Sequence, residues 1–484
     1  MTASASPPGP PATDEAAAAP RRWFALAVLA GSQLLIVLDA TIVNVALTDI
    51  RADLDLAVAD LQWVVTAYVL TFGGFLLLGG RLADRVGRRL MFIAGVAVFG
   101  LASLVAGLAE SVAVLVAGRA VQGMAAAVMA PASLSLLMTV FPPGRDRHRA
   151  LAVWGGVSAS GTALGLILGG VLTQILSWEW VFWVNVPIAV LAALCAWFVL
   201  PTDHVEQGQR FDLTGALLAT AGLTALVYGL VETAEGGPAS SSDLPALAAA
   251  PLLLLVFARL QAIRAHALIP ARLLRNQTVL GGNLVGLILG AAIYALFYFL
   301  SLFMGDTLGY GPVETGLAFL PMTLAIAGGS ALAGRLLGRT GARALLIASA
   351  VLVTMALASL SRIAPDSTYP AILLPGLLLA GLGLGLAFVA LTAAAVGSAP
   401  TVDSGIAAAL FNAAQQVGGA LGLAVLTAAS TARTRSLAPP TGALTPQAIT
   451  QGWSLGFLLA AAIMLVGLVI IMTMIRTARQ ATDG

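Results

Sequence analysis

The sequence predicts an all-α polytopic membrane protein with fourteen transmembrane helices. Of its 484 residues, 59% are hydrophobic and 10% are charged, whereas soluble domains carry roughly 25% charged residues. Apolar stretches of about 20 residues, enough for a helix to cross a ~30 Å hydrocarbon core, recur from residue 23 to residue 475. The net charge of +2 and the scattered arginines give no reason to expect a nucleic-acid partner.

Fourteen segments are apolar and long enough to span a lipid bilayer. In chain order they are 23–48, 61–80, 90–109, 112–139, 151–176, 181–200, 213–233, 244–264, 278–303, 315–337, 344–363, 369–396, 404–430 and 453–475. We expect residues 1–22, rich in Pro, Ala and Ser, to be a disordered cytoplasmic tail and not a cleaved leader. Residues 476–484 are expected to form a second cytoplasmic tail.

Arginine supplies all 24 basic residues, and the chain has no lysine. Four arginines (Arg51, Arg362, Arg433 and Arg435) fall on one side of the fourteen spans, Arg119 falls within a span, and the remaining nineteen fall on the side of the termini. The positive-inside rule therefore predicts that both termini are cytoplasmic, in the cell (inner) membrane.

The missing lysine also limits the chemistry. A P-loop needs a Lys for the nucleotide phosphates, and a Schiff base needs a Lys amine. We therefore expect an ion gradient as the energy source for any uphill transport. No cofactor and no metal site are expected. The one cysteine, Cys195, allows no intramolecular disulfide.

A ten-residue sequence occurs twice. Gly80–Arg89 (GRLADRVGRR) follows the second span, Gly334–Arg343 (GRLLGRTGAR) follows the tenth, and six of the ten positions are identical. Two related six-helix bundles at 23–200 and 278–475, with two inserted helices at 213–264, would place both copies at equivalent points. Transporters are often built from such repeats, with the binding site between them.

These residues resemble a known family. Gly80–Arg89 is similar to the loop motif of the major facilitator superfamily, and Leu38–Leu47 (LDATIVNVAL) resembles the first-helix motif of its fourteen-helix drug/proton antiporters. Further similar stretches are 62–68, 118–123, 185–187 and 405–422. The resemblance covers nearly all of the chain after the N-terminal tail.

The resemblance implies the major-facilitator fold and an exporter that exchanges small amphipathic drugs, antibiotics or related metabolites for protons. Three residues depart from the family pattern: Thr48 and Leu166 replace prolines, and Glu179 replaces a frequent arginine. Leu166 lies in the fifth-span antiporter motif, so it bears on the exchange function more than on the fold.

Two charges are predicted deep within the membrane. Asp39 lies about nine residues, or ~14 Å, from the outer end of the first span, and Arg119 lies at a similar depth in the fourth. A charge at this depth costs about 2.5–3.5 kcal/mol on insertion scales, so it seldom lacks a role. We expect Asp39 and Arg119 to couple proton movement to transport; a permanent ion pair that clamps the helices is the structural alternative.

The first copy of the repeat is expected to be a conformational latch, the role that the resemblance implies. Positive-inside charge alone would explain its arginines, but it does not explain the acid among them or the flanking glycines. The residues of this predicted latch are Gly80, Asp84, Arg85, Gly87, Arg88 and Arg89.

Small residues in the fifth span predict close helix packing, because Gly161, Gly165 and Gly169, followed by Gly170, recur every four residues. Polar side chains near the midplane are candidates for a substrate cavity, although hydrogen bonds between helices would also explain them. These candidates are Tyr68, Gln122, Asn412, Gln415 and Gln416.

The expected partners are a neutral or monocationic amphipathic molecule, protons and the lipid bilayer, with the chain functional as a monomer. An importer or symporter of a small organic solute is the main alternative. A lipid-sugar glycosyltransferase, suggested by the acids between the first two spans, lacks an outer domain for an acceptor, and a sensor or scaffold would need an output domain. We therefore predict a transporter and not an enzyme.

Overall fold

The computed structural model describes residues 12–142, 145–201, 212–236, 244–264, 271–395, 404–437 and 444–475. Within these residues the regular structure consists of sixteen α-helices and two π-helical segments, without strands. Ten segments of the described chain are long and apolar enough to cross a membrane. The prediction of an all-helical, multi-pass membrane protein is therefore confirmed.

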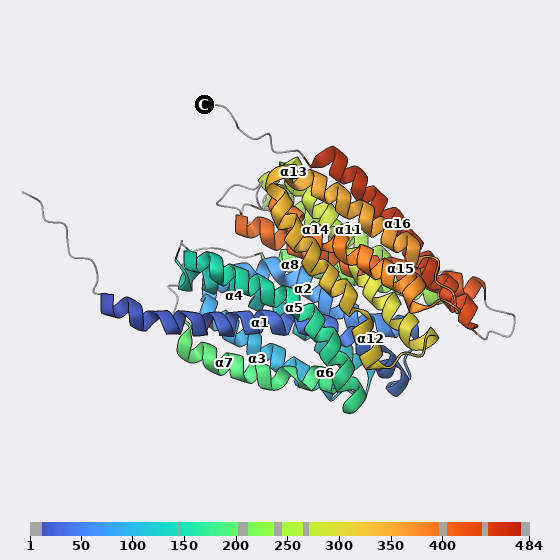
Figure 1. Ribbon diagram of the computed structural model, residues 1–484, viewed down its shortest axis with the longest axis horizontal. Coiled ribbons are helices and arrows are strands. Elements are labelled where there is room, and N and C mark those ends of the chain that lie inside the picture. The colour runs from blue at the N-terminus through green and yellow to red at the C-terminus, as the bar shows by residue number, and fades with distance from the viewer. Residues whose placement is uncertain are drawn as a thin grey trace, which may run out of the picture.

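The first helices form one packed group, which occupies the lower part of Figure 1. In this N-terminal group α1 packs against α5, α2 against α4, and α3 against both α4 and α7. The members are α1 (Ala12–Asp53), α2 (Val58–Val86), α3 (Arg88–Gly107), α4 (Val112–Val140), α5 (Arg145–Ile175), α6 (Trp180–Trp183) and α7 (Asn185–Val199).

Most of the later helices form a second group in the upper part of Figure 1, whereas α12 lies lower and packs against α5 of the N-terminal group. Here α11 packs against α15 and α16, and α13 packs against α14 and α16. The members of this C-terminal group are α10 (Ala271–Arg275), α11 (Gln277–Leu302), η1 (Phe303–Thr307), α12 (Pro312–Ala318), α13 (Leu320–Leu360), η2 (Tyr369–Leu373), α14 (Leu374–Ala395), α15 (Ser404–Ser436) and α16 (Pro446–Met474).

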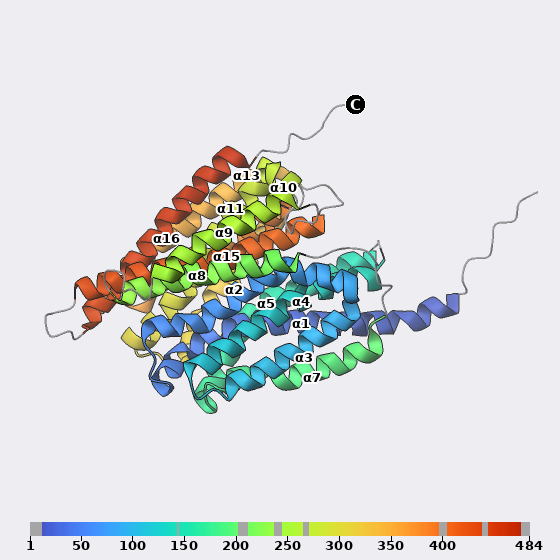
Figure 2. The same ribbon diagram turned by 180° about the vertical axis from the view of Figure 1, so that it is seen from behind.

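Two helices between these groups pair with each other, as Figure 2 shows from behind. They are α8 (Leu213–Gly236) and α9 (Leu244–Ile263). Asp212, buried at the start of α8, accepts a hydrogen bond from Gln261 Nε2 at 2.7 Å and forms an ion pair with Arg264, which together tie α8 to the end of α9. Because α8 also contacts α2 and α15, the pair lies against both groups.

The repeated sequence turns the chain in the same way in both groups. Gly87, between α2 and α3, has φ 114°, and Gly341, at a kink inside α13, has φ 76°. Residues with a side chain seldom adopt such positive φ values, so glycine is required at both turns. These two glycines occupy the same position of the ten-residue repeat.

Three details differ from the sequence predictions. The tail predicted for residues 1–22 is helical from Ala12 onward, which the high helix propensity of its alanines explains; residues 1–11 and 476–484 lie outside the described chain. Helix α2 continues to Val86, so Gly80 lies within a helix and not beside a turn. The sixth predicted span is divided into α6 and α7.

Candidate functional site

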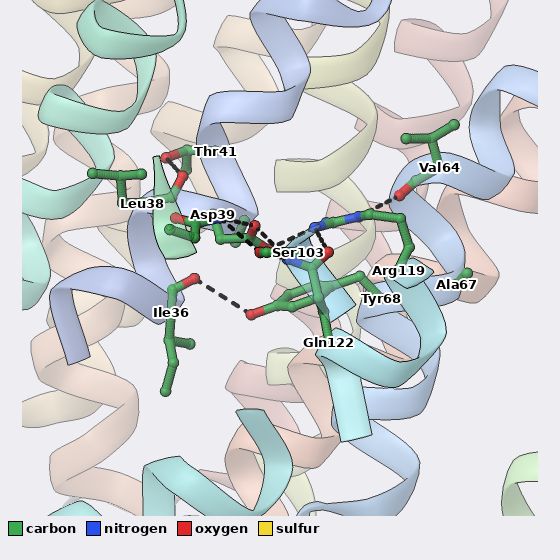
Figure 3. Close-up of polar contacts among 12 residues, drawn as sticks. Ile36, Leu38, Asp39, Thr41, Val64, Ala67, Tyr68, Ser103, Arg119 and Gln122 are labelled. Atoms are coloured by element: carbon green, nitrogen blue, oxygen red, sulfur yellow. Dashed lines mark hydrogen bonds and ion pairs between the residues drawn. The ribbon is translucent and has the colours of Figure 1, made fainter. Parts of the chain in front are cut away.

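A buried ion pair lies inside the N-terminal group. Arg119 Nη1 of α4 is 2.6 Å from Asp39 Oδ2 of α1, and the two side chains are 1% and 0% exposed. The similar depths predicted for these residues are thus accompanied by direct contact (Figure 3). An isolated charge in such a place is very costly, and a pair is tolerated only when further hydrogen bonds satisfy both partners.

Two more side chains supply those hydrogen bonds, and a third side chain accepts from both of them. Gln122 Nε2 of α4 and Asn185 Nδ2 of α7 donate to Asp39 Oδ1 at 2.9 Å and 2.8 Å. The same two nitrogens donate to Ser103 Oγ of α3 at 2.6 Å and 3.1 Å. We call Asp39, Ser103, Arg119, Gln122 and Asn185 the buried polar cluster; it joins α1, α3, α4 and α7.

The rest of the Arg119 guanidinium is also engaged. Arg119 Nε donates to the carbonyl of Val64 on α2 at 2.9 Å, and Nη1 donates to Gln122 Oε1 at 3.0 Å. Its Cζ atom lies 4.4 Å from the centre of the Tyr68 ring, a cation–π distance. The Tyr68 hydroxyl donates in turn to the carbonyl of Ile36 at 3.3 Å (Figure 3).

A cavity of about 380 Å³ adjoins this cluster and is bounded by both helix groups. Tyr68 belongs to its wall, so one ring contacts Arg119 on one side and borders the cavity on the other. Its other polar lining residues are Gln33, Thr41, Ser135, Trp154, Tyr294, Asn412 and Gln416.

A second cavity, of about 180 Å³, shares Ala40, Thr41, Tyr294 and Gln416 with the first. The Tyr294 hydroxyl donates to Gln416 Oε1 at 3.0 Å on this shared wall. Neither cavity has an acidic residue, a histidine or a cysteine among its described lining residues. We call the two together the central cavity; it can take an apolar molecule that offers a few hydrogen-bonding groups.

Four of the five predicted cavity residues line the central cavity: Tyr68, Asn412 and Gln416 its larger part, and Gln415 and Gln416 its smaller part. Gln122 does not, because its amide is buried between Asp39 and Ser103. The sequence reasoning missed Gln33, Thr41, Asn44, Trp154 and Tyr294 on the cavity walls and Ser103 and Asn185 in the cluster. Asn185 carried a signal, as a lone amide in an apolar stretch.

The predicted glycine stripe packs α5 tightly against neighbouring helices. A Cβ atom added at Gly161, Gly165 or Gly169 would press on Val37, Leu38 or Ile42 of α1. A Cβ atom at Gly170 would meet Pro312 of α12 in the other group.

The two helix groups also meet through an ion pair near the C-terminal end of α1. Arg51, in the last turn of α1, forms two 2.7 Å hydrogen bonds with the carboxylate of Asp306 in η1. Gly316 of α12 approaches the backbone carbonyl of Leu166 on α5. The two groups are therefore in contact at the end that carries Arg51, which we call the closed end.

The predicted latch residues lie where α2 ends and α3 begins, at the end of the N-terminal group opposite Arg51. A Cβ atom added at Gly80 would lie 3.5 Å from Pro131 of α4. Arg88 Nη1 lies 3.5 Å from Thr139 Oγ1, and Arg89 donates to the carbonyl of Trp197. Arg85 is exposed on the last turn of α2, and Gly87 makes the turn. Asp84 belongs to α2, but its side chain lies outside the described part of the structure.

The sequence of this chain is similar to those of known membrane transporters. The sequence model of the Major Facilitator Superfamily matches residues 29–423. The puromycin resistance protein pur8 of Streptomyces alboniger is 40% identical over 96% of this chain and 93% of its own. The cephamycin export protein CmcT of Amycolatopsis lactamdurans is 41% identical over 83% of this chain and 84% of its own.

The fold is similar to that of solved transporters. The inward-facing, occupied structure of a bacterial homologue of the human lysosomal transporter Spinster superposes with a TM-score of 0.67. The alignment covers 94% of this chain and 96% of the other, with 15% identity.

The buried ion pair predicts a specific pattern of stabilities. Arg119→Gln leaves the Asp39 carboxylate buried without its counter-charge, so the free energy of unfolding in detergent should fall by about 3–5 kcal/mol. Adding Asp39→Asn removes the second charge and should restore most of that loss. Arg149→Gln, which breaks only the exposed pair with Asp146, is the matched control and should cost at most about 1 kcal/mol. A double variant less stable than Arg119→Gln alone would contradict this account.

Proposed function

The chain belongs to the major facilitator superfamily, and from that premise we propose that it exports small amphipathic molecules in exchange for protons. Its relatives pur8 and CmcT are named for antibiotic resistance and antibiotic export, which supports drugs, antibiotics or related metabolites as cargo. The observation that carries the proposal is the buried Asp39–Arg119 pair, which is separated from the central cavity by the Tyr68 ring.

Proton coupling would act through Asp39. Its carboxylate accepts hydrogen bonds from three side chains, and this arrangement stabilises the charged form. A proton on Asp39 would cancel the attraction to Arg119 and free the guanidinium that stacks on Tyr68. Cargo that presses on Tyr68 from the cavity would disturb the same contact from the other side. The proton and the cargo would thus act on the same Arg119–Tyr68 contact from opposite sides.

The membrane potential would help to drive this exchange. Moving one proton inward releases about 2.3 kcal/mol per 100 mV. For a neutral cargo, that energy offsets a gradient of roughly fiftyfold, since about 1.4 kcal/mol corresponds to tenfold. A monocationic cargo that leaves in exchange for one proton moves no net charge, so only the pH gradient would drive its export.

The cavity walls favour a neutral or monocationic cargo. Their polar groups are hydroxyls, an indole and side-chain amides such as Asn412 and Gln416, set among apolar side chains. Strongly charged cargo would lack a counter-charge there, whereas a single ammonium group could lie over the ring of Tyr68 or Tyr294. Transport without catalysis, by one chain acting as a monomer, is the function we assign.

We further propose fourteen membrane spans, arranged as six helices, two inserted helices and six helices. Ten segments are long enough by themselves, and α5, α8 and α9 contribute shorter apolar stretches. The 49-residue segment Pro312–Leu360 would be about 74 Å long as one helix, more than twice a ~30 Å core, and its kink at Gly341 divides it into two spans. The cell membrane, with both termini cytoplasmic, follows from the arginine distribution.

The Gly80–Arg89 region is proposed to be a latch between conformations. Arg88 and Arg89, at the start of α3, contact α4 and the end of α7, so a shift of the turn between α2 and α3 would disturb contacts with two neighbouring helices. The second copy has Gly338 where Asp84 stands in the first, so the charged latch would be one-sided.

The exchange proposal predicts that Asp39→Asn abolishes proton-driven transport. The amide keeps the shape of the carboxylate but cannot take up a proton, so substrate-induced proton movement in proteoliposomes under a pH gradient should fall to background. Puromycin is a suitable first probe because pur8 is named for it. Binding of the probe should persist, since the cavity walls are unchanged.

Asp146→Asn is the matched control, because this acid is exposed at the start of α5 and pairs only with Arg149 in the described chain. It should exchange at the wild-type rate. If Asp39→Asn exchanged at that rate too, Asp39 would not carry the proton. Movement of probe and proton in the same direction would make the protein a symporter and overturn export.

The fourteen-span topology predicts the side reached by reporter fusions. A reporter that is active only in the cytoplasm should be active after Gly484, and one placed in 232–243 should be inactive. An alkaline phosphatase fusion should give the reverse pattern. Exterior activity at the C-terminal fusion would require an odd number of spans.

The latch proposal predicts a defect in turnover without a defect in insertion. Asp84→Asn should express normally and bind the probe, but it should slow transport by at least several-fold because a charge is lost from contacts that must form and break. Gly338→Asn, at the equivalent point of the second copy, is the control and should transport normally. Normal turnover of Asp84→Asn would leave the region as a topology signal.

A further inference from the structure

A separate pocket of about 360 Å³ lies where the ends of α1, α4 and α7 meet, away from the central cavity. Its walls include Arg21 and Arg22 of α1, Thr139 of α4, and Val199 and Pro201 at the end of α7. In both ribbon views the start of α1 runs beside this end of α7 (Figures 1 and 2). This volume is ample for a phosphate group.

The charge of this pocket is positive. Arg21 Nη2 donates to the carbonyl of Phe198 at 3.2 Å, which holds its guanidinium in place, and Arg88 of α3 approaches the lining residue Thr139. No described residue accepts a hydrogen bond from Arg22, and the described lining residues include no acid. Two adjacent guanidinium groups with spare N–H donors are suited to bind phosphate oxygens in pairs.

Large apolar side chains surround the arginines and face outward. Trp197 and Phe198 of α7 are 57% and 73% exposed, and Trp23 and Phe24 of α1 are 39% and 50% exposed. The Arg89 guanidinium lies 5.4 Å from the centre of the Trp197 ring. Tryptophan next to arginine is typical of the boundary between lipid headgroups and acyl chains. The pocket therefore opens at headgroup level, beside a surface that acyl chains can cover.

We propose that this pocket binds the phosphate of an anionic phospholipid. Arg21 and Arg22 hold the phosphate, and the acyl chains lie along the exposed aromatic side chains of α1 and α7. A free phosphate ion would share the arginine contacts but would not use the aromatic surface, so the two sources can be separated. The site is separate from the Asp39–Arg119 pair and borders the latch residues Arg88 and Arg89.

The test measures the affinity of the purified full-length protein for phosphatidylglycerol, from the rise in its melting temperature in detergent. Each interfacial arginine strengthens binding roughly fivefold, so Arg21→Gln with Arg22→Gln should weaken phosphatidylglycerol binding about 25-fold. Arg21→Lys with Arg22→Lys keeps both charges and should stay within about fivefold of wild type. Phosphatidylcholine, which has the phosphate but no net charge, should stabilise the protein much less.

Arg335→Gln with Arg339→Gln is the matched control, since it removes two exposed arginines from the second copy of the repeat. It should bind phosphatidylglycerol within about twofold of wild type. Equal phosphatidylglycerol binding by the Arg21/Arg22 glutamine variant and this control would overturn the proposal. Inorganic phosphate that stabilises the protein as strongly as phosphatidylglycerol would overturn the lipid assignment. If the double glutamine variant does not fold, Arg22→Gln alone should show about a fivefold loss, and wild-type affinity in that variant would also refute the site.

Discussion

The ion pair between Asp39 and Arg119 constrains the N-terminal helix group more than any other single contact. Two charges that are buried away from water in a membrane interior are tolerated only if they form an ion pair and their remaining hydrogen-bonding groups have partners. Here that requirement brings α1, α3, α4 and α7 to one point, and Val64 adds α2 through a backbone carbonyl. The hydrogen bonds of the buried polar cluster fix how these helices are positioned along one another. The contacts around the cluster are packing between small and apolar side chains.

Helix α1 connects this pair to the rest of the molecule. Asp39 faces the buried polar cluster, while the next residues, Ala40 and Thr41, line the central cavity. Twelve residues beyond Asp39, or about 18 Å along the helix, Arg51 is paired with Asp306 in the other group. A rigid helix that meets the charge, the cavity and the closed end of the molecule can convert a change at one of them into a movement at the others.

The sequence was informative where one residue is chemically conspicuous in its surroundings. Asp39 and Arg119 stand out in apolar segments, and Tyr68, Asn412 and Gln416 stand out at mid-span, so their depth could be predicted from helix geometry alone. Ser103 gave no signal, because a serine among apolar residues satisfies its hydroxyl in many ways. The pairing of Arg51 with Asp306 was also out of reach, because it depends on how two groups 255 residues apart in the chain meet.

The buried interactions within the N-terminal group are stronger than the contacts between the two groups, which suits a transporter whose two halves move relative to each other. Inside the N-terminal group the charges are fully buried and hydrogen-bonded, so separating them is expensive. Between the groups, the Arg51 and Asp306 side chains are 28% and 16% exposed, and an ion pair this accessible contributes about 1 kcal/mol or less. The other contacts between the groups at this end are made by glycines of α5 and α12, where the helix backbones approach closely. Separating these helices costs little, because lipid chains can replace the apolar contacts that are lost.

Leu166, in place of the family's proline, keeps its N–H group and leaves α5 continuous from Arg145 to Ile175. The closed end can therefore open by separating two intact helix faces, while the helices that hold the buried charges move as one body.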